Sequence, residues 1–281
     1  METLLMTLTR NLFRSSYFAT LATALILSIS VFSPNALSEE QEGSTLGRIY
    51  LAQINSYYSI NGFYNFSANQ GDQKHLTVIV DSSNKIDELI NTIQGEVNDS
   101  PDTDDFKEVS GAWKKYKKVL NQNIKEVKKT GYPDLRLAGD MATENIKLNS
   151  TLETLYNSLA GTPSNKPNKI TEMSRKAGIS LALMMTKYSA RTTSTVSQVY
   201  SGGDTEITID ALANEFETLL KELMNQTKGN EQALDLLDSA LTKWDFIKSS
   251  YINYNENRVN FIVNLYSKKI ISDIDLALES L

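Results

Sequence analysis

The sequence predicts an all-α protein made of two tandem up-down four-helix bundles that are related by internal duplication. Three observations lead to this prediction. Apolar residues recur every three or four positions through eight segments of the chain. Short stretches that contain Gly, Pro, Asn or Asp separate these segments. The second half of the chain also repeats landmarks of the first half at a nearly constant offset.

The tryptophans mark the repeat most clearly. Trp113 and Trp244 are the only two tryptophans in the protein, and they lie 131 residues apart. The same offset separates three further pairs: Gly47 and Gly178, Tyr57 and Tyr188, and Lys117 and Lys248. Between these landmarks the offset slips by one, so that the apolar positions of 84–93 match those of 214–223. We interpret the coincidence of landmarks and apolar phase as a duplication.

In the first copy, four segments have a helical period. Three of them are 44–66, 77–97 and 134–160. The clearest lies between the last two, where seven apolar residues step by three or four: Phe106, Val109, Trp113, Tyr116, Leu120, Ile124 and Val127. Four amphipathic helices with short connections are typical of an up-down bundle.

The second copy has the same four segments, at 169–200, 208–228, 231–254 and 256–280. In the first of them, "KAGISLALMMTKYSA" (176–190) is apolar and rich in methionine. Its charged residues Lys176 and Lys187 leave only ten uncharged positions between them, and a membrane span needs about 20. We therefore interpret this stretch as an amphipathic helix whose apolar face packs into a core. That face is expected to hold Ala177, Leu181, Met184, Met185 and Tyr188, continued by Val196 and Val199.

The joints between segments contain residues that end helices. Gly131 is placed to end the third helix, and Pro133 to precede the fourth. "HLTVIVD" (75–81) has strand-like residue types, but its mate 206–212 continues into a helical phase, so both are interpreted as helix starts. The linker 161–168 contains two prolines and no apolar run, and it divides a first bundle, 39–160, from a second, 169–281. The two bundles would stack end to end if the last helix of the first led directly into the second. Limited proteolysis in the linker should release two helical halves.

Residues 1–38 have the pattern of a secretory signal peptide. Arg10 and Arg14 precede an uncharged, largely apolar run of 16 residues, 17–32, and "ALS" (36–38) supplies a small-x-small site. We expect cleavage after Ser38 and a periplasmic or secreted mature protein. An uncleaved N-terminal anchor is the alternative. The chain has no cysteine, so that no disulfide and no lipid-attachment cysteine is expected.

Composition excludes several functions. The net charge of −6 argues against a nucleic-acid partner, which requires a basic face. His75 is the only histidine, and the sequence contains neither a Walker A motif nor a G-x-G-x-x-G run. The acidic joints lack the spacing of a calcium loop. We expect no catalytic residue, no metal site and no cofactor.

The first helix of each copy resembles a known family. "STLGRIYLAQI" (44–54) and "SRKAGISLALMMTK" (174–187) are similar to the opening helix of the extracytoplasmic sensor domain shared by the type IV pilus chemoreceptor PilJ and the nitrate/nitrite sensor kinases of the NarX type. The resemblance covers most of 44–281 and implies a helical sensor bundle. In the nitrate-sensing members an arginine three residues after the glycine reaches the anion. Tyr50 and Leu181 stand at that position here, so the resemblance does not imply nitrate binding.

The same stretch gives the candidate binding residues. Gly47, Arg48 and Tyr50 combine a small residue, a cation and an aromatic ring, and Gly178 is the matching glycine of the second copy. Ligands in helical bundles sit between facing helices, and small residues let those helices approach. We expect an acidic small ligand to use the first copy, with Arg48 as its charged anchor. An ordinary surface role for Arg48 is the alternative.

Together these features predict an exported, non-enzymatic, sensor-like protein of the bacterial cell envelope that binds a small ligand or a partner protein. Abundant Asn and Lys without disulfides fit a bacterial envelope protein, and no output domain is expected in the chain. A structural or adhesive envelope spacer is the alternative function. An enzyme of an unrecognised class is a third.

Overall fold

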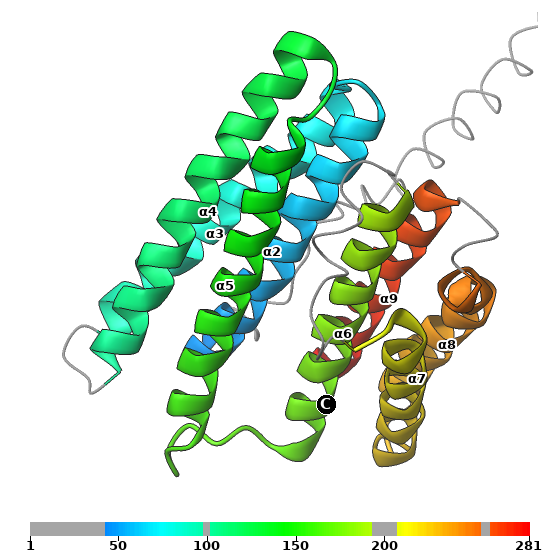
Figure 1. Ribbon diagram of the computed structural model, residues 1–281. Helices are drawn as coiled ribbons and strands as arrows, with labels where there is room; N and C mark the ends of the chain where they lie inside the picture. Colours follow the sequence, from blue (N-terminus) through cyan, green and yellow to red (C-terminus); the bar gives the residue numbers. More distant parts are fainter. Residues whose placement is uncertain (1–42, 98–101, 193–206, 254–258) are drawn as a thin grey trace, which may run out of the picture. The chain divides into compact units, whose positions relative to one another are not determined.

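The computed structural model describes residues 43–97, 102–192, 207–253 and 259–281. Within these ranges the chain forms eight α-helices and no β-strand, which confirms the all-α class for the part described (Figure 1). All eight helices belong to the unit 37–281. Their bounds are α2 Thr45–Ala68, α3 Gln73–Val97, α4 Thr103–Thr130, α5 Leu135–Ala160, α6 Lys169–Thr192, α7 Ile209–Gln226, α8 Glu231–Ile252 and α9 Asn260–Glu279.

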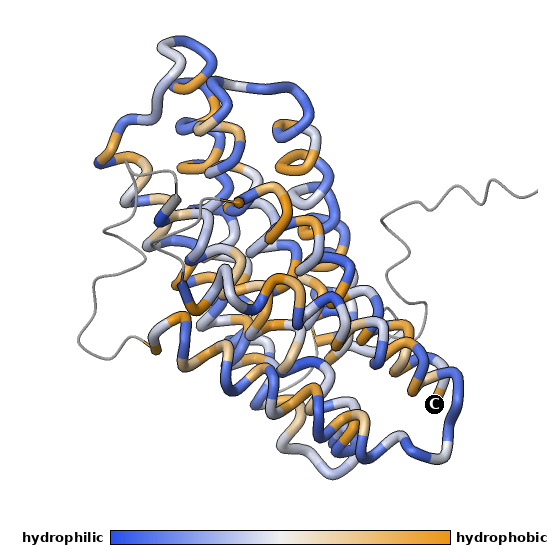
Figure 2. The backbone as a smooth tube through the Cα atoms, turned by 90° about the vertical axis from the view of Figure 1, so that its right-hand side faces the viewer, coloured by the Kyte–Doolittle hydropathy of each residue, from blue (hydrophilic) through white to orange (hydrophobic). Residues whose placement is uncertain are grey.

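The helix boundaries follow local side-chain chemistry. Ser44 and Asp134 accept hydrogen bonds from backbone N–H groups at the starts of α2 and α5, at 3.0 and 2.8 Å. Gly131 ends α4 with a φ of 82°, the left-handed conformation that favours glycine, as predicted. Residues 75–81 are helical within α3, as predicted from the phase of their mate. Figure 2 shows hydrophobic and hydrophilic residues alternating within each turn of the helices, which is the pattern of amphipathic helices.

Some predictions concern residues outside the described ranges. These are the signal peptide 1–38 with its cleavage after Ser38, and the continuation of the second-copy helix through Val196 and Val199. Among the helices of the described residues, none is both long enough and apolar enough to cross a membrane.

The helices contact one another in the same order in both halves of the chain. In the first half, α2 packs on α3 and α5, and α4 packs on α5 and, less extensively, on α3. In the second half, α6 packs on α7 and α9, and α8 packs on α9 and α7. The last helix of each half therefore lies against the first helix of that half.

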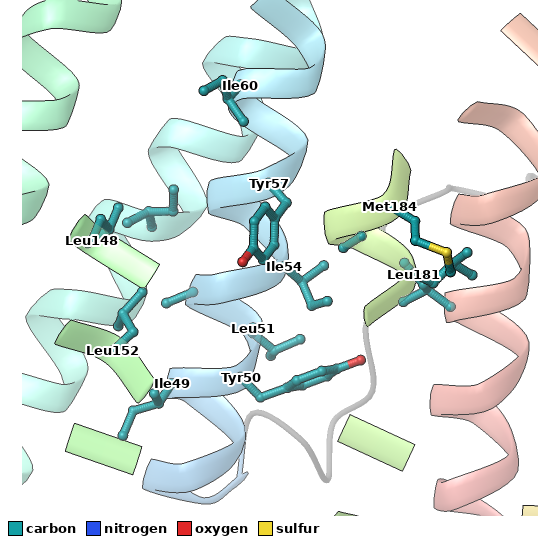
Figure 3. Close-up of a cluster of buried hydrophobic side chains, with 14 of the residues drawn as sticks. Ile49, Tyr50, Leu51, Ile54, Tyr57, Ile60, Leu148, Leu152, Leu181 and Met184 are labelled. Carbon is teal, nitrogen blue, oxygen red and sulfur yellow. The ribbon is translucent and has the colours of Figure 1, made fainter. Parts of the chain in front are cut away.

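The two halves meet along α2 and α6, which pack against each other. Figure 3 shows apolar side chains around α2 with Leu148 and Leu152 of α5 on one side and Leu181 and Met184 of α6 on the other. The chain turns back in the linker, so that α6 lies beside α2. An end-to-end arrangement of the halves is therefore not what the structure shows.

Because α6 contacts α2, α7 and α9, its burial is wider than the single apolar face that was predicted. The five predicted core residues of 176–190 are all buried. Several small or polar residues between them are buried as well: Ser180, Ala182, Thr186, Lys187, Ser189 and Ala190. The helix α2 is similar, since 20 of its 24 residues are buried.

Polar side chains buried between these helices have partners in neighbouring helices. Asn61 of α2 donates to the Ser189 hydroxyl of α6, at 2.8 Å. Asn145 and Asn149 of α5 both donate to the Ser56 hydroxyl of α2, at 2.8 and 2.9 Å. A buried polar group is stabilising only when it is paired, so these contacts fix which residues of the helices face each other.

Each half also contains a carboxylate that is shared by a tryptophan and a lysine. In the first, Trp113 Nε1 donates to Asp87 at 2.8 Å, and Lys117 pairs with the same carboxylate. In the second, Trp244 Nε1 donates to Glu217 at 3.4 Å, and Lys248 pairs with that carboxylate. Both indole side chains are buried. In the offset that slips by one, Asp87 and Glu217 are matched positions.

Candidate functional site

Arg48, the predicted anchor, faces α3. Its Nη1 atom lies 2.6 Å from Glu96 Oε1, and its side chain is 17% exposed. Thr45 donates to the other oxygen of Glu96, at 2.8 Å. The charge of Arg48 is therefore matched by a carboxylate of the same half. Gly47 is buried in the first turn of α2.

Tyr50 and Gly178, in contrast, are in direct contact. Tyr50 is fully buried and points from α2 toward α6 (Figure 3). A Cβ atom at position 178 would overlap the Tyr50 hydroxyl oxygen and would lie 3.1 Å from ring atom Cζ, so this approach requires glycine. The structure thus brings together two of the four predicted residues, one from each half, while Arg48 pairs elsewhere.

The Tyr50 hydroxyl donates to Asp275 Oδ1 of α9, at 2.9 Å. Asp275 is 2% exposed, and its Oδ2 atom has no hydrogen-bond partner among the described residues. Burial raises the pKa of the Asp275 carboxyl to about 7, with a further contribution from the nearby charge of Glu279. The hydrogen bond from Tyr50 and the charge of Arg175 act in the opposite direction on this pKa.

A pocket of about 760 Å³ lies next to these residues, where α2, α6 and the 161–168 linker begin and α5 and α9 end. It is lined by Ser44, Thr45 and Leu46 of the α2 start, Leu159 of α5, linker residues 164–168, Ile170, Thr171 and Arg175 of α6, and Leu278, Glu279 and Leu281 at the end of the chain. None of the four predicted residues lines it. Leu46 immediately precedes Gly47, however, and Arg175 lies one helical turn before Gly178.

The pocket wall contains charges of both signs. Arg175 is 6% exposed, and its Nη1 atom donates to the Tyr156 hydroxyl at 3.3 Å. The same guanidinium lies 5.9 Å from the centre of the Tyr156 ring, which also stabilises it. Glu279 is partly buried on α9, and Lys166 is exposed in the linker. Leu46, Leu159, Ile170 and Leu278 give the wall its apolar part.

This arrangement suits binding. A desolvated guanidinium, a carboxylate and apolar side chains around one cavity can hold a small molecule in a fixed orientation. Within the ranges that the structure describes, no group of three or more His, Asp or Glu side chains is placed to hold a metal ion.

Sequence reasoning missed Arg175, Asp275 and Glu279 as members of this region. Arg175 belongs to the stretch that resembles the sensor family, but it precedes the glycine and was grouped with surface cations. Asp275 did leave a signal: it lies four residues after Ile271 and one after Ile274, so that it occupies an apolar phase of α9. An isolated acid at such a position indicates a buried carboxylate.

No family model matches the chain, and neither the curated proteins nor the solved structures include a significant match to it. The resemblance to the PilJ and NarX sensor domains therefore rests on the residues of the two opening helices alone.

Proposed function

We propose that this chain is an exported, non-enzymatic protein of the bacterial cell envelope that binds a small ligand in the pocket between α2, α5, α6 and α9. The observation that carries the proposal is the buried guanidinium of Arg175 in the wall of that pocket. Removing a charge from water is unfavourable, and a ligand group that pairs with it offsets this term. The signal-peptide pattern of 1–38 supports export.

We further propose that the two halves are four-helix bundles derived from one ancestral bundle. The repeated order of helix contacts supports this origin. So does the repeated carboxylate shared by a tryptophan and a lysine, because Asp87 and Glu217 were matched by offset before any contact was considered. The same duplication supports a relationship to the PilJ and NarX sensor domains, whose opening motif resembles α2 and α6.

A protein partner is the second candidate, in an adhesive or spacer role. The observation that favours it is an exposed aromatic pair on α8 and α9. Phe246 is 61% exposed, and its ring lies 5.1 Å from that of Tyr266. Phe261, also 61% exposed, lies on the same helix as Tyr266. Exposed aromatic side chains are enriched where proteins associate.

A thermal-shift screen of the purified protein against small carboxylates, amines and amino acids tests the proposal. A molecule that binds only the folded state must raise the melting temperature. We expect the rise to be lost in Arg175→Gln and kept in Arg48→Gln, a matched control because both substitutions remove a guanidinium from the first turns of a leading helix.

Loss in Arg48→Gln with retention in Arg175→Gln would move the site back to the residues predicted from sequence. If no compound raises the melting temperature while a pull-down from the envelope fraction recovers a partner that Phe246→Ser no longer binds, the protein has the spacer or adhesive role.

A further inference from the structure

We infer that the pocket takes a zwitterion of the aliphatic amino-acid class, which presents a carboxylate and an ammonium group beside a short apolar side chain. This inference rests on the proposed function, namely that the pocket binds a small ligand. It follows from three features of the wall.

The first feature is the cationic side of the pocket. Arg175 reaches it from α6 and is held by the hydroxyl and the ring of Tyr156 on α5. A guanidinium has five N–H donors in a planar fork that matches the two oxygens of a carboxylate. Contact with Tyr156 limits its orientations, so that less conformational entropy is lost when a carboxylate binds.

The second feature is the anionic side. Glu279 enters the same pocket from α9, on the helix that also contains the buried Asp275. The charge of Glu279 disfavours the ionised form of Asp275, so the two carboxyl groups act on each other. A ligand with only negative charge would add to this repulsion. An ammonium group beside Glu279 would relieve it.

The third feature is the apolar wall between the charged residues, formed by Leu46, Leu159, Ile170 and Leu278 from four different helices. An apolar side chain placed there loses contact with water, whereas a second charged group would be desolvated without a partner. Opposite charges with an apolar surface between them match an amino acid such as leucine, valine or methionine better than a simple anion or a simple amine.

The test is titration calorimetry with L-leucine, L-valine and L-methionine, and with the two analogues of leucine that each lack one charged group. These analogues are 4-methylpentanoate, without the ammonium group, and 3-methylbutan-1-amine, without the carboxylate. We expect at least one amino acid to bind, and the matching single-charge analogues to bind at least about tenfold more weakly.

The variants should separate the two charges. Arg175→Gln should weaken binding of the amino acid by about tenfold or more without weakening the amine, and Glu279→Gln should weaken the amino acid without weakening 4-methylpentanoate. Arg175→Lys keeps the charge and should retain part of the affinity. Thermal melting of each unliganded variant establishes that it folds, so loss of binding is assigned only to folded variants.

Two outcomes overturn the inference and leave the proposed function standing. One is 4-methylpentanoate or the amine binding as tightly as leucine. The other is failure of all three amino acids while an unrelated compound raises the melting temperature through Arg175. If neither the amino acids nor any screened compound binds, both the inference and the proposed function are wrong.

Discussion

At the scale of single residues, the most unusual group is the carboxyl of Asp275. It is buried between the two halves and has one hydrogen bond in the described residues, from Tyr50. Most buried carboxylates have more partners than this, because an ionised oxygen without a donor is strongly unfavourable. The site therefore favours the protonated form, which is why the pKa is raised to about 7.

The raised pKa predicts how stability depends on pH. The folded state holds the Asp275 proton up to about pH 7, whereas the unfolded chain loses it near the ordinary value of 3.8. Its stabilising contribution is thus complete below about pH 3.8 and is lost as the pH rises through about 7. A shift of about three units corresponds to about 4 kcal/mol.

Asp275→Asn should remove this dependence, because an amide cannot ionise and can still accept from Tyr50. Urea unfolding from about pH 5 to about pH 8 should show a loss of stability in the unchanged protein that is absent in the variant. Glu96→Gln, which changes the carboxylate paired with Arg48, is the control and should leave the slope in place. Equal slopes in the protein and in Asp275→Asn would show that the carboxyl ionises normally.

The contact between Gly178 and Tyr50 makes a second prediction. Gly178→Ala should destabilise the protein by about 1–3 kcal/mol, because the added methyl group overlaps the tyrosine hydroxyl. In a Tyr50→Phe background the overlapping atom is absent, and the same substitution should cost clearly less. A double-mutant cycle measured by urea unfolding gives the coupling. Additive effects would mean that the two residues do not touch.

At the scale of helices, most of the architecture could be predicted from the sequence. All eight described helices correspond to predicted segments, because a 3.6-residue period and local breakers such as Gly131 act over short distances. The burial of α2 could not be predicted. Its Gln53, Asn55, Asn61 and Asn65 have the composition of a solvent-exposed face, and only the neighbouring helices reveal that they are inside.

The same limit applies to the candidate site. Gly178 and Tyr50 were identified by their spacing, but their mutual contact depends on how α2 and α6 pack. Arg48 and Arg175 are both cations near a glycine, and nothing local distinguishes the one paired with Glu96 from the one in the pocket wall. Partners that lie more than a hundred residues apart are set by tertiary packing.

The tryptophans offer a test of the matched elements α4 and α8. Trp113→Ala and Trp244→Ala should each destabilise the protein by about 3–5 kcal/mol, since each removes a large buried side chain and leaves a carboxylate with one partner fewer. Both indoles should emit at short wavelength, as measured with each single-tryptophan variant containing Phe at the other position. Emission typical of a hydrated indole from either would contradict its burial.

At the scale of the whole unit 37–281, the contact between α2 and α6 changes the expected result of proteolysis. The linker 161–168 is mostly exposed and remains the expected first site of cleavage. Release of two separate halves, as the sequence alone predicted, would expose the apolar surface between α2 and α6 and would break hydrogen bonds such as Asn61 to Ser189.

We therefore expect the nicked protein to stay together. Under native conditions it should elute from gel filtration at the volume of the uncut chain, and only denaturant should separate the fragments. The uncut protein in the same denaturant is the control. Two peaks of half size without denaturant would show that the contact between the halves is weak.

The central position of α2 also has a consequence for how the chain is made. Ribosomes synthesise α2 before any helix that covers it, and the Tyr50 hydroxyl meets its partner only when a residue 225 positions later has been added. Until then, a helix that is buried on nearly every side lacks most of its neighbours. Contacts over such sequence distances form slowly, and unfinished chains expose apolar surface. The nascent protein therefore depends on its last helix to complete its first.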